Sequence, residues 1–283
     1  MSLADTGALV DAAVRDGGAV LAFNVIGLEH AEGIVAGLER AGAPGILQIS
    51  ENAVRHRGGL HGPLVAACRE LAAASSCSVS IHLDHVQDAG LAHTVIAEAR
   101  QRGTSSIMVD AAHLDYDDNV RTTAALAHEA HGASLWVEAE LGEIGGKDGA
   151  HAPGVRTDPR EAAAFVASTG VDGLAVAVGS THAMTSATAQ LDLDLIGRIA
   201  AEVTVPLVLH GSSGVPIETL RTAVARGIRK INIGTALNVD FTRRVRETLE
   251  ADLAVTDPRT YLAPARDAVA ESVAAVSTSV LSR

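Results

Sequence analysis

The chain has 283 residues, of which 47% are hydrophobic and 20% are charged, a balance typical of globular proteins. Its formal net charge of −12 leaves no basic face for a phosphate backbone, so we expect no nucleic-acid partner. No stretch approaches the roughly 18 uninterrupted apolar residues of a membrane span. The two cysteines, Cys68 and Cys77, are expected to be buried reduced thiols, and the acidic start lacks a secretory pattern, which together predict a cytoplasmic protein without a membrane partner.

Short apolar runs rich in Val, Ile and Leu recur along the whole chain. We expect eight strands, at residues 19–25, 45–50, 78–84, 105–110, 134–141, 173–179, 206–211 and 230–235. Alanine-rich segments with apolar residues at helical spacing lie between the strands, as at 91–101 and 157–169. Apolar strands that alternate with helices are typical of a parallel sheet whose outer face is covered.

Eight such units in one chain favour a closed (β/α)₈ TIM barrel, formed as a single domain over residues 1–283 with extra helices after residue 239. The alternative is a doubly wound open sheet, which needs a glycine-rich dinucleotide turn after its first strand. Residues 22–30 contain a single glycine, so that signal is absent. No linker or low-complexity tract marks a domain boundary.

Every predicted strand ends in a polar residue, at the position where (β/α)₈ barrels carry their active sites. Three are histidines on different strands, namely His85, His182 and His210. Three protein ligands with a fourth position open to substrate are typical of a catalytic zinc site. The alternative for any single residue is a loop side chain that caps a helix. The remaining strand ends carry Asn24, Ser50, Asp84, Asp110, Glu140, Ser180, Ser213, Asn232 and Thr235.

The string His-Leu-Asp-His at 82–85 holds two further candidates. Strand alternation places His82 and Asp84 on one face, so we expect His82 to line the barrel and form a hydrogen bond there. Asp84 lies at the strand end beside His85, where a carboxylate near a polarised carbonyl or hydroxyl can transfer a proton. Its alternative role is to orient a histidine ligand.

Two late loops combine glycine with hydroxyl side chains and lead into helices. They are HGSSGVP at 210–216 and NIGT at 232–235. Backbone N–H groups and hydroxyls at a helix N-terminus bind anions, and barrels often bind phosphate between their last two loops. This position favours a phosphorylated substrate.

Together these motifs resemble the class II, zinc-dependent fructose- and tagatose-bisphosphate aldolases. The resemblance runs from Phe23 to Arg246 and is carried by AFN, HLDHVQD, SSIMVDAAH, VEAELGEIGG, GVDGLAVAVGSTHA, PLVLHGSSGVP and KINIGTALN. It implies cleavage of a phosphorylated ketose between C3 and C4, which yields dihydroxyacetone phosphate and an aldehyde. It also implies a homodimer or homotetramer.

The resemblance assigns roles by position. It implies Zn²⁺ on His85, His182 and His210, with Asp84 as the proton donor to the aldehyde oxygen. Asp110 and Glu140 match a site for a second or alternative cation, divalent or monovalent. The positions that match contacts to phosphate, dihydroxyacetone phosphate or the rest of the substrate are Asn24, Ser50, Gly211, Ser213, Asn232 and Thr235.

Three places depart from the family's pattern. An acidic pair usual after the glycines of the fifth loop is replaced by Lys147 and Asp148, and Asp148 is the candidate that handles the C3 proton. Ala183 and Ser186 replace a glycine and a lysine near phosphate, which removes one charge contact. Gly234 replaces an aspartate frequent in fructose-type enzymes, which leaves the preferred C4 stereoisomer open.

We therefore expect a zinc-dependent aldolase of phosphorylated ketoses. A second hypothesis is another metal-dependent sugar-phosphate barrel enzyme, an epimerase or a hydrolase, and an epimerase would release no triose phosphate. A third is a non-catalytic barrel that binds a sugar phosphate as a sensor. The three histidines beside Asp84 favour catalysis, because binding alone does not require them.

Overall fold

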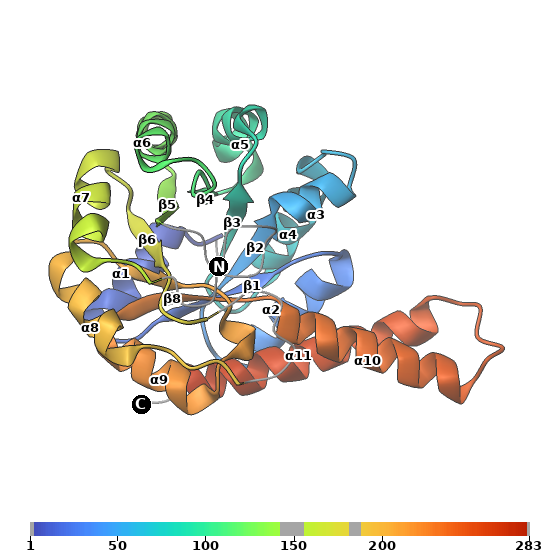
Figure 1. Ribbon diagram of the computed structural model, residues 1–283. Coiled ribbons are helices and arrows are strands. Elements are labelled where there is room, and N and C mark those ends of the chain that lie inside the picture. Colours follow the sequence, from blue (N-terminus) through green and yellow to red (C-terminus); the bar gives the residue numbers. More distant parts are fainter. Residues whose placement is uncertain (1–2, 142–155, 181–187, 282–283) are drawn as a thin grey trace.

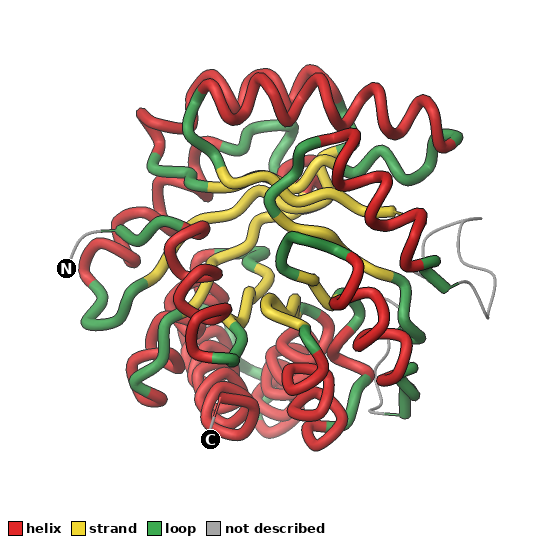
Figure 2. Tube along the Cα trace, turned by 90° about the vertical axis from the view of Figure 1, so that its left-hand side faces the viewer, coloured by secondary structure: helices red, strands yellow, loops and turns green. Residues whose placement is uncertain are grey.

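Eight parallel strands form a closed barrel, in which each strand pairs with its neighbours in sequence order and β1 closes onto β8. The computed structural model describes residues 3–141, 156–180 and 188–281. Figures 1 and 2 show the strands enclosed by helices. The strands are β1 (Val20–Asn24), β2 (Gly45–Ser50), β3 (Val79–Val86), β4 (Ser106–Val109), β5 (Trp136–Leu141), β6 (Gly173–Val176), β7 (Leu207–Leu209) and β8 (Ile228–Ile233). The predicted (β/α)₈ barrel is confirmed.

Helices lie before, between and after the strands and surround the barrel. They are α1 (Thr6–Asp16), α2 (Leu28–Ala41), α3 (Glu51–His56), α4 (Gly62–Ala74), α5 (Ala89–Arg102), α6 (Tyr116–Gly132), α7 (Pro159–Thr169), α8 (Leu193–Glu202), α9 (Ile217–Arg226), α10 (Thr235–Ala251) and α11 (Arg259–Leu281), with a 3₁₀ turn η1 at Ser212–Gly214. The expected C-terminal extension is present, because α10 and α11 pack together and project beyond the barrel (Figure 1). Within the described ranges, no helix is both long enough and apolar enough to cross a membrane.

Several strands end earlier than the apolar runs suggested. The run at 173–179 contributes only Gly173–Val176 to the sheet, and the run at 206–211 only Leu207–Leu209. Glycines in the left-handed region turn the chain away soon after these strands, with φ of 114° at Gly179 and 64° at Gly211. Strand β8 cannot reach Thr235, because that residue already begins α10.

The main hydrophobic core lies between the strands and the surrounding helices. Inside the barrel the apolar clusters are small, and Trp136 packs against both of them. The buried interior also contains polar side chains, at Gln48, Ser80, His82, Ser106, Glu138 and Lys230. His82 lines the barrel as predicted, and its Nδ1 lies 2.8 Å from the hydroxyl of Ser106.

Two glycines on α2 allow α11 to approach closely. A Cβ at Gly37 would lie 2.6 Å from the carbonyl oxygen of Ala270 and 2.6 Å from Cβ of Val273. A Cβ at Gly33 would meet the carbonyl oxygen of Arg266 at 2.7 Å. The C-terminal helix α11 therefore packs tightly against α2 at these two glycines.

We expect Gly37→Ala to lower the free energy of unfolding by about 1–3 kcal/mol, because overpacking forces backbone or side chains to move. Urea denaturation measures the change. The matched control is Gly132→Ala, at the end of α6, where an added Cβ meets nothing within 4 Å. Equal stability of the two variants would contradict the close approach of α2 and α11.

The two cysteines are free and differ in exposure. Cys68 is buried, as expected, and burial raises the pKa of its thiol to about 12. Cys77 is only half-buried, because it lies in the loop that follows α4. Since the thiolate is the reactive form, a disulfide reagent at pH 8 should label one thiol per chain in the native protein and both after denaturation. Labelling of Cys68 in the native protein would contradict this prediction.

Candidate active site at the carboxyl end of the barrel

Two of the predicted histidine ligands meet at the carboxyl ends of β3 and β7. The rings of His85 and His210 have centroids 4.9 Å apart in an edge-to-face arrangement. One ligand atom each from Asp84, His85 and His210 lies within 4.8 Å of the others. His182, the third predicted ligand, lies outside the described residues. The structure therefore brings together the described members of the predicted set.

A β-bulge in β3 directs the side chain of His85 towards this site. The pairing of β3 with β4 shifts register between Leu83 and Val86, and His85 has a φ of 50°, rare for a residue with a Cβ. Strict alternation would place His85 on the outer face with Leu83, which is part of the main core. The bulge lets the adjacent Asp84 and His85 both reach the same site.

The two predicted acidic positions lie around these histidines. Nδ1 of His85 lies 2.9 Å from Oδ2 of Asp110, which also accepts a hydrogen bond from Gln87 at 3.0 Å. Oε2 of Glu140 lies 3.9 Å from Nδ1 of His85 and 3.7 Å from Nδ1 of His210. One ligand atom each from His85, Asp110 and Glu140 forms a second group within 4.8 Å.

Glu138 defines the protonation state of His210. Burial raises the pKa of Glu138, but Lys230 and His210 outweigh burial and lower it to about 2. The ionised carboxylate lies 2.8 Å from Nε2 of His210, which therefore carries the proton. Burial lowers the pKa of His210, so the ring is neutral and its Nδ1 keeps a lone pair.

Asp84 is almost completely buried yet stays ionised. Burial would raise the pKa of its carboxyl, but the neighbouring His85 and the ring of His82, whose Nε2 lies 3.7 Å from Oδ1 of Asp84, hold it well below the usual range. Gln48 donates to Oδ2 of Asp84 at 3.0 Å. A buried carboxylate beside two histidines can accept or return a proton.

The donor set fits a divalent metal ion. Imidazole nitrogens and carboxylate oxygens are ligands that suit zinc and related divalent metals. Asp110 on His85 and Glu138 on His210 supply the outer carboxylates that orient metal-binding histidines. The chemistry of these residues is therefore that of a metal centre.

The predicted substrate positions surround this centre at four strand ends. Asn24 ends β1, and its Oδ1 accepts a hydrogen bond from Gln48 at 2.7 Å. Ser50 ends β2 and caps α3, because its hydroxyl accepts from the backbone of Ala53 at 3.3 Å. This capping was the alternative weighed for such residues, and a substrate role for Ser50 stays a prediction.

The two predicted phosphate loops are connected to each other. Gly211 turns the chain into η1, and the hydroxyl of Ser213 accepts from the backbone of Ala236 at 3.1 Å. Ala236 follows Thr235 in the first turn of α10, so the loops after β7 and β8 are bonded side by side. Asn232 is buried just below them in β8.

The departure at Gly234 has a steric basis. A Cβ at this position would lie 2.9 Å from Nδ2 of Asn24. An aspartate at this position would force the side chain of Asn24 to move. The glycine therefore allows Asn24 to adopt its observed position. The departures at Lys147, Asp148, Ala183 and Ser186 lie outside the described residues.

The sequence reasoning missed four buried polar residues of the site. Lys230, Glu138 and Gln48 lie inside the barrel, below the metal centre. Alternation could have identified two of them, since Lys230 shares a face with Asn232 and Glu138 shares one with Glu140. The fourth is Glu51, whose carboxylate accepts from the backbone of Gln87 and Asp88 at 2.6 and 2.9 Å and so holds the loop after β3.

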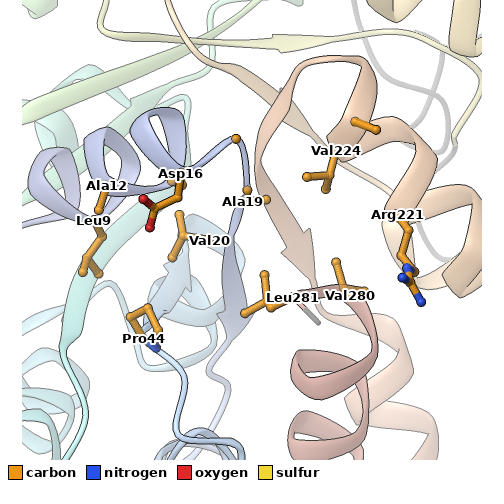
Figure 3. Close-up of a pocket in the computed structure, with 14 residues that line it drawn as sticks. Leu9, Ala12, Asp16, Ala19, Val20, Pro44, Arg221, Val224, Val280 and Leu281 are labelled. Carbon is orange, nitrogen blue, oxygen red and sulfur yellow. The ribbon is translucent and has the colours of Figure 1, made fainter. Parts of the chain in front are cut away.

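A separate hollow of about 410 Å³ lies at the opposite end of the barrel, beside the start of β1 (Figure 3). Its lining is mostly apolar, and its charged side chains are Asp16 and Arg221. It contains none of the histidines or buried carboxylates described above. The chemistry-bearing groups are thus concentrated at the carboxyl end, as expected for a barrel enzyme.

Comparison with known proteins agrees with this geometry. The family model for class-II fructose-bisphosphate aldolase matches residues 4–282. The fructose-bisphosphate aldolase of Geobacillus stearothermophilus is 37% identical over 277 residues, which cover 96% of this chain and 95% of that protein. The fructose-bisphosphate aldolase of Staphylococcus epidermidis (strain RP62A) is 37% identical over 269 residues, which cover 94% of this chain and 92% of that protein.

A solved structure shows the same architecture. The crystal structure of the YdjI aldolase from Escherichia coli K12 superposes with a TM-score of 0.82 at 30% sequence identity, and covers 98% of this chain and 97% of its own. The match thus extends over the barrel and the C-terminal helices. The chain belongs to the class-II fructose-bisphosphate aldolase family, metal-dependent lyases that cleave a phosphorylated ketose into dihydroxyacetone phosphate and an aldehyde.

Proposed function

We propose that this chain is a zinc-dependent aldolase that acts on a ketose bisphosphate of the fructose 1,6- or tagatose 1,6-bisphosphate type. The observation that carries the proposal is the convergence of Asp84, His85 and His210 at the carboxyl end of the barrel. A sugar-phosphate sensor has no need of an ionised buried carboxylate beside two oriented histidines. We further propose that residues 1–283 form one catalytic domain.

Zinc would be held by His85, His210 and His182, the last of which lies outside the described residues. Asp110 and Glu140 would hold a second or alternative cation. When bound, zinc supplies a Lewis acid for the ketone oxygen of the substrate. Asp110 and Glu138 keep the two described histidines in the orientation and protonation state that this requires.

Asp84 would move the proton at C4. In cleavage the C4 hydroxyl must lose its proton as the C3–C4 bond breaks and the aldehyde forms, and the ionised Asp84 can accept it. In the reverse direction the same carboxyl group returns the proton to the aldehyde oxygen. We assign the proton at C3 to Asp148, which follows β5 in the sequence and lies outside the described residues.

The substrate would lie over the ends of β1, β2, β7 and β8. Gly211, Ser213 and Thr235 supply backbone and hydroxyl donors for a phosphate group, next to the first turn of α10. Asn24 and Asn232 supply amide donors for the oxygens of the dihydroxyacetone phosphate half, where negative charge develops as the bond breaks. Ser50 would contact the substrate from β2.

The test is release of triose phosphate from fructose 1,6- and tagatose 1,6-bisphosphate by zinc-loaded protein, with a chelator-treated sample as the control. We expect release that the chelator abolishes and that added zinc restores. The faster sugar identifies the C4 stereoisomer. Epimerised sugar or inorganic phosphate without triose phosphate would instead favour an epimerase or a hydrolase, and tight binding without turnover would favour a sensor.

We also propose a homodimer or homotetramer in the cytoplasm. The projecting hairpin of α10 and α11 offers surface beyond the barrel, with Leu253 at its tip 90% exposed. The two free cysteines accord with a reducing compartment. Light scattering of the purified chain measures the assembly state.

A further inference from the structure

A buried lysine lies below the proposed metal centre and has no role in the mechanism above. Lys230 is on β8 and its side chain is completely buried. Its Nζ donates to Oδ1 of Asn232 at 2.7 Å, to Oε2 of Glu138 at 2.8 Å and to Oε1 of Gln48 at 3.2 Å. These acceptors come from β8, β5 and β2, so the ammonium group links strands across the barrel interior.

An ammonium group has three protons and no lone pair, so it can only donate hydrogen bonds. The three acceptors therefore use all of its protons. The two amides must turn their oxygens towards Lys230, and their nitrogens must point away from it. This fixes an orientation that neither amide could adopt reliably by itself.

The first branch passes through Gln48 to two site residues. Because the side-chain oxygen of Gln48 accepts from Lys230, its Nε2 faces the other way. This nitrogen donates to Oδ2 of Asp84 at 3.0 Å and to Oδ1 of Asn24 at 2.7 Å. Because Asn24 accepts through its oxygen, its own amide nitrogen is left as a donor. A reversed Gln48 would place its carbonyl oxygen against the ionised Asp84.

The second branch ends at Asn232, which is 8% exposed. The side-chain oxygen of Asn232 accepts from Lys230. Its Nδ2 is buried, and no atom of the described residues accepts a hydrogen bond from this nitrogen. A buried donor without an acceptor is costly, so it is suited to an oxygen supplied by a ligand. The third branch is Glu138, whose other oxygen lies 2.8 Å from Nε2 of His210.

We propose that Lys230 is a positioning residue that sets the direction of the hydrogen bonds in the site, so that Asn24 and Asn232 present N–H donors to the oxygens of the triose half. This inference rests on the proposed aldolase function. It explains why a cation is buried in the barrel interior, where its hydrogen bonds go to two amides and one carboxylate. An electron-rich substrate needs donors, and Lys230 ensures that the amides provide them.

The test is a double-mutant cycle of Lys230→Met and Asn232→Ala, in zinc-loaded protein. If Lys230 acts through the amide of Asn232, Lys230→Met should lower kcat/KM by about 100-fold in the otherwise wild-type chain, the usual loss for one oriented donor. In the Asn232→Ala background the same change should cost clearly less, because only the branches through Gln48 and Glu138 then remain. Calorimetric affinity for dihydroxyacetone phosphate, a readout without turnover, should show the same coupling.

Arg229→Met is the matched control on the same strand. Arg229 is half-buried, and it donates to the backbone oxygens of Val224 and Ile228 at 2.8 and 2.9 Å. Arg229→Met should lower the free energy of unfolding and leave kcat/KM unchanged. If Lys230→Met does not fold because it leaves the Glu138 carboxylate buried without its partner, the double variant Lys230→Met/Glu138→Gln removes both charges. This double variant then takes the place of Lys230→Met in the cycle.

Equal fold losses in both backgrounds would overturn the proposal, since a purely structural lysine would act independently of Asn232. Wild-type activity is measured in the same assay. A wild-type chain that neither cleaves the sugars nor binds dihydroxyacetone phosphate would refute the proposed aldolase function itself, separately from the coupling between the two residues.

Discussion

Replacing His85 by alanine should abolish both zinc retention and cleavage. The side chain is held on three sides: the bulge in β3 directs it to the site, Asp110 lies 2.9 Å from its Nδ1, and the ring of His210 lies against it. Alanine keeps the backbone but removes one of the nitrogens that are proposed to bind zinc. Metal content after dialysis and triose-phosphate release measure the two effects.

His93→Ala is the control for this experiment. His93 lies on α5 and, like His85, has a carboxylate partner, with Nδ1 2.8 Å from Glu129, but it is exposed on the outside of the barrel. It should keep full metal content and activity. Cleavage by His85→Ala at the wild-type rate would refute the proposed metal centre. The variant His210→Ala tests the same metal centre through the histidine that follows β7.

Asp84→Asn should lower kcat by roughly 10²–10⁴-fold, the range associated with removal of a positioned acid or base. The amide has nearly the same shape, and its oxygen can still accept the hydrogen bond from Gln48, which lies 3.0 Å from Oδ2 of Asp84. It cannot take up a proton from the C4 hydroxyl. Zinc content should be unchanged, because the proposed ligands are intact. Steady-state cleavage and metal analysis of the same preparation test both statements.

Asp88→Asn is the matched control for Asp84→Asn. Asp88 follows the same strand, and its carboxylate accepts from the backbone of Leu91 at 2.7 Å to cap α5. Asparagine is an equally good cap, so activity and stability should both persist. Loss of zinc in Asp84→Asn would show instead that Asp84 is a metal ligand. Unchanged kcat would remove it from the proton transfer.

The sequence by itself determined the order of the elements and the end of the barrel that carries chemistry. Strand and helix periodicities are local properties, so eight apolar runs separated by amphipathic segments were enough to predict the barrel. In such a barrel all strand ends face one side, which placed Asp84, His85 and His210 together before any coordinates. The resemblance to aldolases is confirmed at the level of the family, and the residue roles that it implies stay predictions.

Only the tertiary structure decided which polar side chains meet inside the barrel. Strict alternation separates Asp84 from His85, and the bulge that unites their side chains depends on how β3 pairs with β4. Lys230 and Glu138 are 92 residues apart in sequence and lie on strands that are not neighbours in the sheet. Their contact exists because the strands close into a barrel, so that side chains of β5 and β8 meet in its interior, and such long-range pairing is not encoded in any local pattern.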